Sequence, residues 1–359
     1  MRSAEPTSEG ARVLAICNAC RYCEQYCPAF QAMEERRTFA TADLHYLANL
    51  CHGCGECLYA CQYAPPHEFA INVPQTFARL RVHSYEQYAW PAALGALFRR
   101  QGVTAALLLA AALIAAMLGA TWLANGAALR APGAGADFYA VVPHSVMATL
   151  FGGVGLLVVA ALTVGVARCR REFRAAQASV HATTSALAGG GALGDVLTLR
   201  HLHVGGQDCV TALEVRTPWR RWLHHATFYG FALCFAATCV ATLYHFLGAP
   251  APYAYTSLPV LLGTAGGLLL AVGPAGLLLQ HRDPLLCDTT ERDLDRSFLV
   301  LLLLTALTGL LLLPLRTGPL MGYLLVVHLG VVLALFVTLP YGKLVHGLYR
   351  AAALVQFRG

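Results

Sequence analysis

Two short runs of cysteines carry the most distinctive chemistry in this sequence of 359 residues. The first reads C-x2-C-x2-C-x3-C-P and ends at Pro28, and the second reads C-x2-C-x2-C-x3-C and ends at Cys61. This is the spacing of bacterial ferredoxins with two clusters, in which the fourth cysteine of each run binds the other cluster. We therefore predict two [4Fe-4S] clusters. The ligands of the first are Cys17, Cys20, Cys23 and Cys61. The ligands of the second are Cys51, Cys54, Cys57 and Cys27.

Other uses of eight closely spaced cysteines fit the sequence less well. Structural zinc takes four ligands, commonly as two separated pairs, and a redox C-x-x-C motif needs only one pair. Gln62 follows Cys61 where a ferredoxin run could have proline, which changes the turn but removes no ligand. The first residues contain no apolar run typical of an export signal, so we expect reduced thiols rather than a disulfide framework.

A second set of candidate ligands is four histidines at the ends of long apolar stretches. They form two pairs at matched depths, His224 with His346 on the inner side and His245 with His328 on the outer side. His328 and His346 are 18 residues apart, or about five helical turns, and so share a face, whereas His224 and His245 are about 60° from alignment. Polar residues within a membrane are costly and point to function. We predict cofactor-binding roles for these histidines, holding b-type haem, either one or two.

Three alternatives to this assignment stay open. Each histidine alone could be an interfacial residue whose ring reaches the lipid headgroups. His225 could replace His224 as a ligand if the helix end unwinds. His144 is a further candidate for the outer site.

The elements that must position these residues follow from composition. Hydrophobic residues make up 57% of the chain and charged residues 12%, about half the charge of a soluble protein. Six apolar stretches have the length of about 20 residues that a membrane helix needs. They are 103–122, 146–167, 226–247, 258–279, 298–315 and 321–342.

We therefore expect two domains and a mixed fold class. Residues 1–92 would form a cytoplasmic, ferredoxin-like domain with two [4Fe-4S] clusters, in which metal binding supplies part of the folding free energy. Residues 93–359 would form an all-α, six-helix transmembrane bundle that binds haem like a cytochrome b, with a cytoplasmic loop at about 168–221.

The basic residues predict the orientation of the bundle. The loops on one side and the regions flanking the bundle hold most of the arginines and lysines, whereas the opposite loops hold only Arg130 and Arg316. The positive-inside rule then places both termini in the cytoplasm, as in a multi-pass protein of a bacterial inner membrane. The basic residues mark orientation, and we do not expect a nucleic-acid partner. The residues on the predicted cytoplasmic side are Arg99, Arg100, Arg168, Arg170, Arg171, Arg174, Arg200, Arg216, Arg220, Arg221, Arg282, Arg292, Arg296, Lys343, Arg350 and Arg358.

One motif in the predicted loop is misleading. The sequence GGGALG at 189–194 matches the G-x-G-x-x-G fingerprint, but a dinucleotide site needs a strand before it and a helix after it within a βαβ unit. We interpret it as a flexible hinge, and expect no flavin or nicotinamide bound by this chain.

The order of the two cysteine runs and the six apolar stretches, with RRWLHHATFYGFALCFAATCVATLYH and GTAGGLLLAVGPAGLLL, resembles the tricarballylate/citrate utilisation protein B family. The related half of a cobalamin-biosynthesis flavohaem protein is similar. The resemblance implies an electron carrier in the membrane. Its partner would be a separate FAD-dependent dehydrogenase, which oxidises tricarballylate and whose reduced FAD the carrier re-oxidises.

The function expected is electron transfer from that reduced FAD through two [4Fe-4S] clusters and b-type haem to the quinone pool. No catalytic base, nucleophile or substrate pocket is visible, so an oxidoreductase system is expected in which this chain has no substrate site of its own. One alternative is a redox component of corrin-ring oxidation in cobalamin biosynthesis. Another is an iron-sulfur redox sensor or a membrane anchor, which would need no paired histidines.

Overall fold

The computed structural model describes residues 5–98, 102–130, 138–178, 190–198, 200, 219–249, 252–280 and 284–358. These residues form helices joined by turns, and none of them lies in a strand. The expected small N-terminal domain followed by an all-α bundle with six long apolar helices is found, but the described part of the chain is all-α rather than mixed. The physical reason is that the turns around the two cysteine runs connect helices, so the N-terminal domain needs no sheet.

Six short helices make up the N-terminal region. They are α1 Pro6–Cys20, α2 Pro28–Glu34, α3 Thr41–Leu50, α4 Glu56–Tyr59, α5 Val73–Tyr88 and α6 Ala92–Phe98. Proline stands in the first turn of α1, α2 and α5, where its missing N–H costs no hydrogen bond. The side chain of Asn72 caps α5 by accepting a hydrogen bond from the backbone N–H of Gln75 at 3.0 Å.

Six long apolar helices follow, as the sequence predicts. They are α7 Val103–Arg130, α9 His144–Ala178, α11 Trp219–Phe246, α12 Leu258–Leu279, α13 Thr289–Leu315 and α14 Met321–Thr338. Each is long and apolar enough to cross a membrane. The remaining helices are short: α8 Phe138–Val141, α10 Gly190–Thr198, the 3₁₀ turn η2 Pro284–Leu286 and α15 Val345–Arg358.

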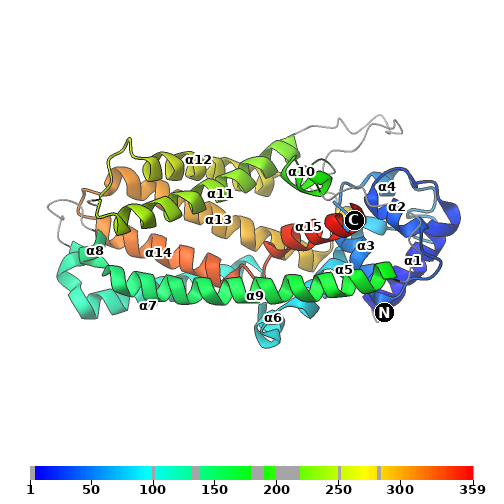
Figure 1. Ribbon diagram of the computed structural model, residues 1–359, viewed down its shortest axis with the longest axis horizontal. Helices are drawn as coiled ribbons and strands as arrows, with labels where there is room; N and C mark the ends of the chain where they lie inside the picture. The colour runs from blue at the N-terminus through cyan, green and yellow to red at the C-terminus, as the bar shows by residue number, and fades with distance from the viewer. Residues whose placement is uncertain are drawn as a thin grey trace.

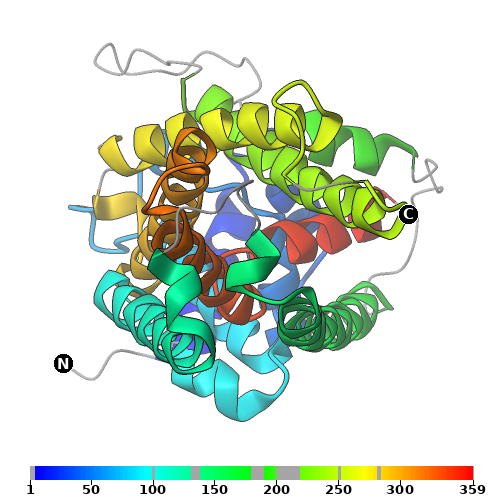
Figure 2. The same cartoon turned by 90° about the vertical axis from the view of Figure 1, so that its left-hand side faces the viewer.

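The long helices form one elongated bundle with α1 to α5 at one end, called here the cysteine end (Figure 1). Helix α11 packs along α12, α12 packs on α13, and α14 packs on α7 and α13. Viewed from the opposite, far end, α11 and α12 lie on one side of the bundle and α7 lies on the other (Figure 2). A Cβ atom at Gly230 of α11 would lie 2.9 Å from the backbone nitrogen of Leu270 in α12, so the close packing of this pair requires glycine.

Helix α9 extends well beyond a bilayer. Its 35 residues span about 52 Å, whereas a hydrocarbon core is about 30 Å thick. The extra turns bury Cys169, Phe173 and Ala176, spaced four and three residues apart, against the N-terminal region. The loop predicted at 168–221 therefore begins as helix rather than loop. Its remaining described parts are α10, Arg200 and the start of α11.

The glycine-rich motif was also expected to be a hinge. Instead, Gly190–Thr198 form α10, so that interpretation is wrong for these residues. Of the basic residues that predict orientation, Arg99, Arg100, Arg216 and Arg282 lie outside the described residues.

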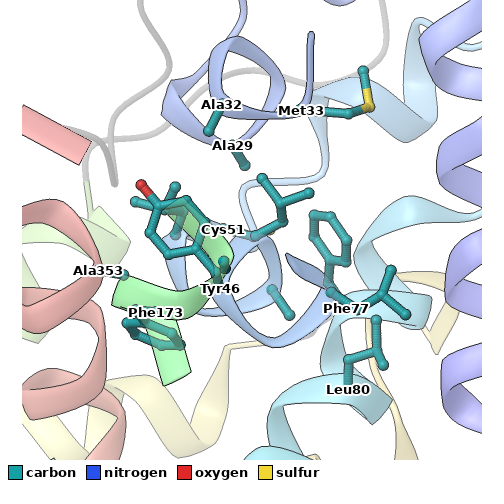
Figure 3. Packing of buried hydrophobic residues seen from close by; sticks show 14 of the residues in the cluster. Ala29, Ala32, Met33, Tyr46, Cys51, Phe77, Leu80, Phe173 and Ala353 are labelled. Atoms are coloured by element: carbon teal, nitrogen blue, oxygen red, sulfur yellow. The ribbon is translucent and has the colours of Figure 1, made fainter. Parts of the chain in front are cut away.

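The hydrophobic core at the cysteine end is shared between the two predicted domains. Tyr46 of α3 and Phe77 of α5 are buried in it, and so is Phe173 of α9. The Tyr46 and Phe173 rings meet edge-on with centroids 5.4 Å apart, close to Ala353 of α15 (Figure 3). The small N-terminal region thus completes its core with side chains from the membrane part, which fixes its position on the bundle.

Candidate metal centres

The first cysteine cavity lies beside the C-terminal end of α1. Cys17 and Cys20 are three residues apart in the last turns of α1, which places them on one helix face. Arg21 ends the helix in the left-handed conformation, with φ of 53°, and the chain then turns through Cys23. These three cysteines and Cys61 line a cavity of about 240 Å³.

The second cysteine cavity, also of about 240 Å³, is lined by Cys27, Cys51, Cys54 and Cys57. Cys27 is the N-cap residue of α2, and the backbone N–H groups of Ala29 and Phe30 at this helix start oppose the rise that burial causes in the pKa of its thiol. Such N–H groups at a helix start favour a thiolate.

The fourth cysteine of each run lies with the other run. The charge of Cys61 acts on Cys17 and Cys23. The charges of Cys51 and Cys54 act on Cys27. Cys57 lines both cavities and therefore stands between the two groups. The structure thus brings together the two sets of four cysteines that the ferredoxin spacing predicts.

Several of these thiols are poor candidates for free thiolates. Burial, with the neighbouring cysteines, raises the pKa of Cys17 and of Cys23 to about 12. Burial also raises the pKa of Cys54, to about 11. A bound cation would reverse this effect, because a coordinating thiol loses its proton.

The spacing of the sulfurs fits a cluster better than a single ion. Among the described residues, no three His, Cys, Asp or Glu side chains are close enough to share one metal ion. A single zinc ion draws sulfurs to about 2.3 Å from itself, whereas an iron-sulfur cluster binds each cysteine at a separate iron. Four sulfurs around a cavity of about 240 Å³ fit the second arrangement.

The predicted inner histidine pair comes together at the cysteine end of the bundle. His224 lies in the second turn of α11, and His346 lies at the start of α15. Their ring centroids are 6.0 Å apart. Two imidazole nitrogens on opposite sides of one iron, each with a metal–nitrogen bond of about 2 Å, place the ring centroids about 6 Å apart. The pair therefore has the separation that a shared haem iron requires.

The hydrogen bonding of this pair also suits metal binding. The Nδ1–H of His346 donates to the backbone carbonyl of Lys343, which leaves Nε2 with its lone pair. Ligating histidines commonly donate their other N–H to a carbonyl in this way. Burial and the charges of Arg350 and Lys343 lower the pKa of His346 well below its usual value, so its ring is neutral. The Nδ1 atom of His224 is buried and has no hydrogen-bond partner among the described residues.

His328 has the same kind of support on α14. Its Nδ1 lies 2.9 Å from the hydroxyl oxygen of Thr308 on α13. That hydroxyl donates to the carbonyl of Leu304 at 2.7 Å, so it accepts the proton of Nδ1 and leaves Nε2 available. A Cβ atom at Gly309 would lie 3.0 Å from Cε1 of His328, so glycine makes room for this ring.

The predicted outer pairing of His245 with His328 is not what the structure shows. No ring contact joins them among the described residues, and His245 stacks on His144 with centroids 3.8 Å apart. Tyr139 contacts both stacked rings. The reason is which helices are neighbours. Depth along a helix can be read from a sequence, but the sequence does not say that α11 packs mainly on α12 while α14 packs on α7 and α13.

The second cysteine cavity and the inner histidines are connected by arginine. Nη2 of Arg350 donates to the carbonyl of Cys51 at 2.8 Å, and the charge of Arg350 acts on both inner histidines. Arg220, four residues before His224, likewise acts on Cys54 and on His224. Sequence analysis did not assign Arg350 a role at the site, although it follows His346 by four residues and so lies on the same face of α15.

Comparisons with known proteins agree with the two-part organisation. A family model described as citrate utilization protein B matches residues 98–359. A second, described as the Fer4-like domain of citrate utilization protein B, matches residues 10–94. A protein from Escherichia coli named citrate utilization protein B is 51% identical over 357 residues, covering 98% of this chain and 92% of the relative. No solved structure matches the chain.

Proposed function

The chain belongs to the citrate utilization protein B family, and from that premise we propose that it carries electrons from a reduced flavoprotein to quinone. The Fer4-like domain and the six apolar helices fit an electron-transfer role at a membrane. The resemblance supplies the rest of the proposal. The donor is a separate FAD-dependent dehydrogenase of the tricarballylate type, and the membrane is a bacterial inner membrane with both termini of the chain in the cytoplasm.

One observation carries this proposal: the candidate redox sites follow one another along the molecule. The first cysteine cavity adjoins the second through Cys57. The second adjoins the inner histidines through Arg350 and Arg220. An anchor would need no such order, and an electron carrier depends on it.

The cysteines hold the two proposed clusters in crossed sets, with Cys61 completing the first and Cys27 the second. His224 and His346 hold a b-type haem near the cysteine end. His328 is a candidate ligand of a second haem, and among the described residues neither His245 nor His144 has a ring contact with it. Bound clusters and haems supply one-electron redox couples, which is the chemistry that links a two-electron flavin to a quinone.

The chain's own residues partly shield these groups from water. Cys27, Cys57 and the inner histidines are half-buried, which lowers the local dielectric constant. The carbonyl of Lys343 keeps the proton of His346 on Nδ1, and the Thr308 hydroxyl does the same for His328. Each orientation presents Nε2 to the space where an iron would lie.

The proposal can be tested with the purified protein in lipid vesicles. Anaerobic reduction with dithionite should produce a b-type spectrum, and a soluble quinone analogue should then re-oxidise it. A Cys54→Ser variant, given reduced flavoprotein as the only electron source, should show slowed or abolished haem reduction. Haem that is reduced but is not re-oxidised by the quinone analogue would contradict quinone as the acceptor.

A further inference from the structure

Arg350 occupies the junction between the second cysteine cavity and the inner histidine pair. It lies on α15, one turn after His346, and its Nη2 donates to the carbonyl of Cys51 at 2.8 Å. Its charge acts on His224 and on His346. One side chain therefore touches the backbone of one candidate redox site, shares a helix face with one ligand of the next and acts electrostatically on both of its ligands.

These contacts leave at least one N–H donor of the Arg350 guanidinium without an acceptor within the described parts of the chain. Its Nε is buried and has no hydrogen-bond partner among the described residues. A buried N–H without a partner costs about 1–3 kcal/mol, and more when it is charged, so an acceptor is expected at this edge.

Two other basic side chains nearby, Arg81 and Lys343, each form ion pairs with carboxylates. Arg81 directs both Nε and Nη2 to Glu291, at 2.8 and 3.0 Å. Lys343 pairs with Glu291 at 2.9 Å and with Asp295 at 2.6 Å. Arg350 is half-buried and forms no ion pair with a carboxylate in the part of the chain that the structure describes, and a charge withdrawn from water without such a partner is costly.

We propose that Arg350 binds a propionate carboxylate of the haem held by His224 and His346 while holding the carbonyl of Cys51, and so joins the second cluster site to the inner haem. This rests on the proposed function, because it needs a haem at the inner pair. The chemistry suits arginine, whose planar guanidinium binds a carboxylate through parallel N–H donors.

The assignment makes Arg350 a positioning residue with an electrostatic consequence. A buried cation favours the more negative, reduced state of a neighbouring redox group. Removing that charge should therefore lower the reduction potential of both neighbours. A residue that only braced the backbone of Cys51 would affect the cluster alone.

The test compares Arg350→Gln and Arg350→Lys with a matched control, Arg316→Gln. Arg316 also donates to a backbone carbonyl, that of Tyr253 at 2.8 Å, and also has a buried Nε without a partner, but it follows α13 at the far end. Haem and cluster potentials are measured by optical and electron paramagnetic resonance titrations of the full-length protein. The carboxylate bands of the haem are followed by redox-difference infrared spectroscopy.

Arg350→Gln should lower the inner haem potential by a tenfold change in the reduction equilibrium, which is about 59 mV for one electron, and should also lower the second cluster's potential. Arg350→Lys should keep most of the haem potential but shift the infrared carboxylate band, and Arg316→Gln should do neither. An unchanged haem potential and band in both Arg350 variants would overturn the inference while leaving the proposed function standing. If Arg350→Gln does not fold, an unshifted band in Arg350→Lys alone would overturn it. Absence of haem in the wild-type protein would overturn both.

Discussion

Arg81 of the N-terminal helix α5 and Glu291 of the long helix α13 form a buried, two-pronged ion pair. Nε and Nη2 of Arg81 lie 2.8 and 3.0 Å from the two carboxylate oxygens, and the residues are 5% and 6% exposed. Lys343 adds a third contact to the same carboxylate at 2.9 Å. The pair fastens the cysteine-bearing region to the membrane bundle beside the proposed route of the electrons.

The Arg81–Glu291 ion pair is expected to stabilise the N-terminal region on the helix bundle against urea. Replacing Glu291 with Gln leaves Arg81 and Lys343 without their shared counter-charge. Breaking a buried pair in this way costs about 3–5 kcal/mol. We expect the iron-sulfur absorbance of the Glu291→Gln variant to be lost at a markedly lower urea concentration. Arg79→Gln is the control, because Arg79 is 48% exposed in its 3.4 Å pair with Asp288 and such pairs contribute about 0–1 kcal/mol. Equal urea sensitivity of the two variants would show that Glu291 does not fasten the domains.

The crossed cysteine sets predict which cluster each variant damages. Cys61→Ser should disturb the cluster of Cys17, Cys20 and Cys23, although it belongs to the second run. Cys27→Ser should disturb the cluster of the second run. Electron paramagnetic resonance of the reduced protein distinguishes the two signals, and Cys239→Ser, at an exposed position outside both runs, should leave both unchanged. Loss confined to the cluster of the same run would refute the crossed assignment.

The inner pair predicts a sharp contrast between adjacent histidines. His224→Ala and His346→Ala should each lose the haem nearest the cysteine end, because each removes one of the two residues that would hold it. His225→Ala should retain it, since His225 instead stacks on Tyr229 with ring centroids 5.7 Å apart. Haem content and the reduced-minus-oxidised spectrum are the measurements. Retention of haem by His224→Ala together with its loss in His225→Ala would exchange the two roles.

Three histidines compete for the outer site, and single variants separate them. His328→Ala should remove the outer haem, because Thr308 orients its Nε2 as a ligand. His144 and His245 stack on each other, and neither has a ring contact with His328 among the described residues, so His144→Ala and His245→Ala should each leave that haem bound. Separate titration of the two haems reads out each result. An unchanged haem content and spectrum in His328→Ala would remove this residue from the site.

Much of the molecule follows from its sequence pattern. The six apolar helices are where hydropathy predicts them, because lipid-facing segments must be apolar along their whole length. The helix ends do not follow hydropathy. Helix α13 begins at Thr289 rather than near 298, since Asp288 caps it and Glu291 is paired with Arg81. Hydropathy assigns the charged residues around Glu291 to a loop, whereas in the structure Glu291 lies in the first turn of α13 and forms a buried ion pair with Arg81.

The candidate site likewise has features that follow from the sequence and features that do not. Cysteine spacing alone predicts which eight residues gather and in what crossed order, because a short linker between ligands limits where they can lie. Histidine depth predicts the inner pair but not the outer one. The contact of His245 with His144, the hydrogen bond of His328 to Thr308 and the bridging place of Arg350 depend on helix rotation. A single sequence carries little information on that rotation when most faces of the helices are apolar.

The most direct test of the central claim is the cofactor content of the purified, full-length protein. Non-haem iron is measured alongside a reduced-minus-oxidised spectrum and the ratio of haem to protein. We expect about eight non-haem irons, as two four-iron clusters require, and a b-type α-band that is reduced by His346→Ala. Eight irons without any haem would contradict this expectation, leaving an iron-sulfur protein whose intramembrane histidines carry no electrons.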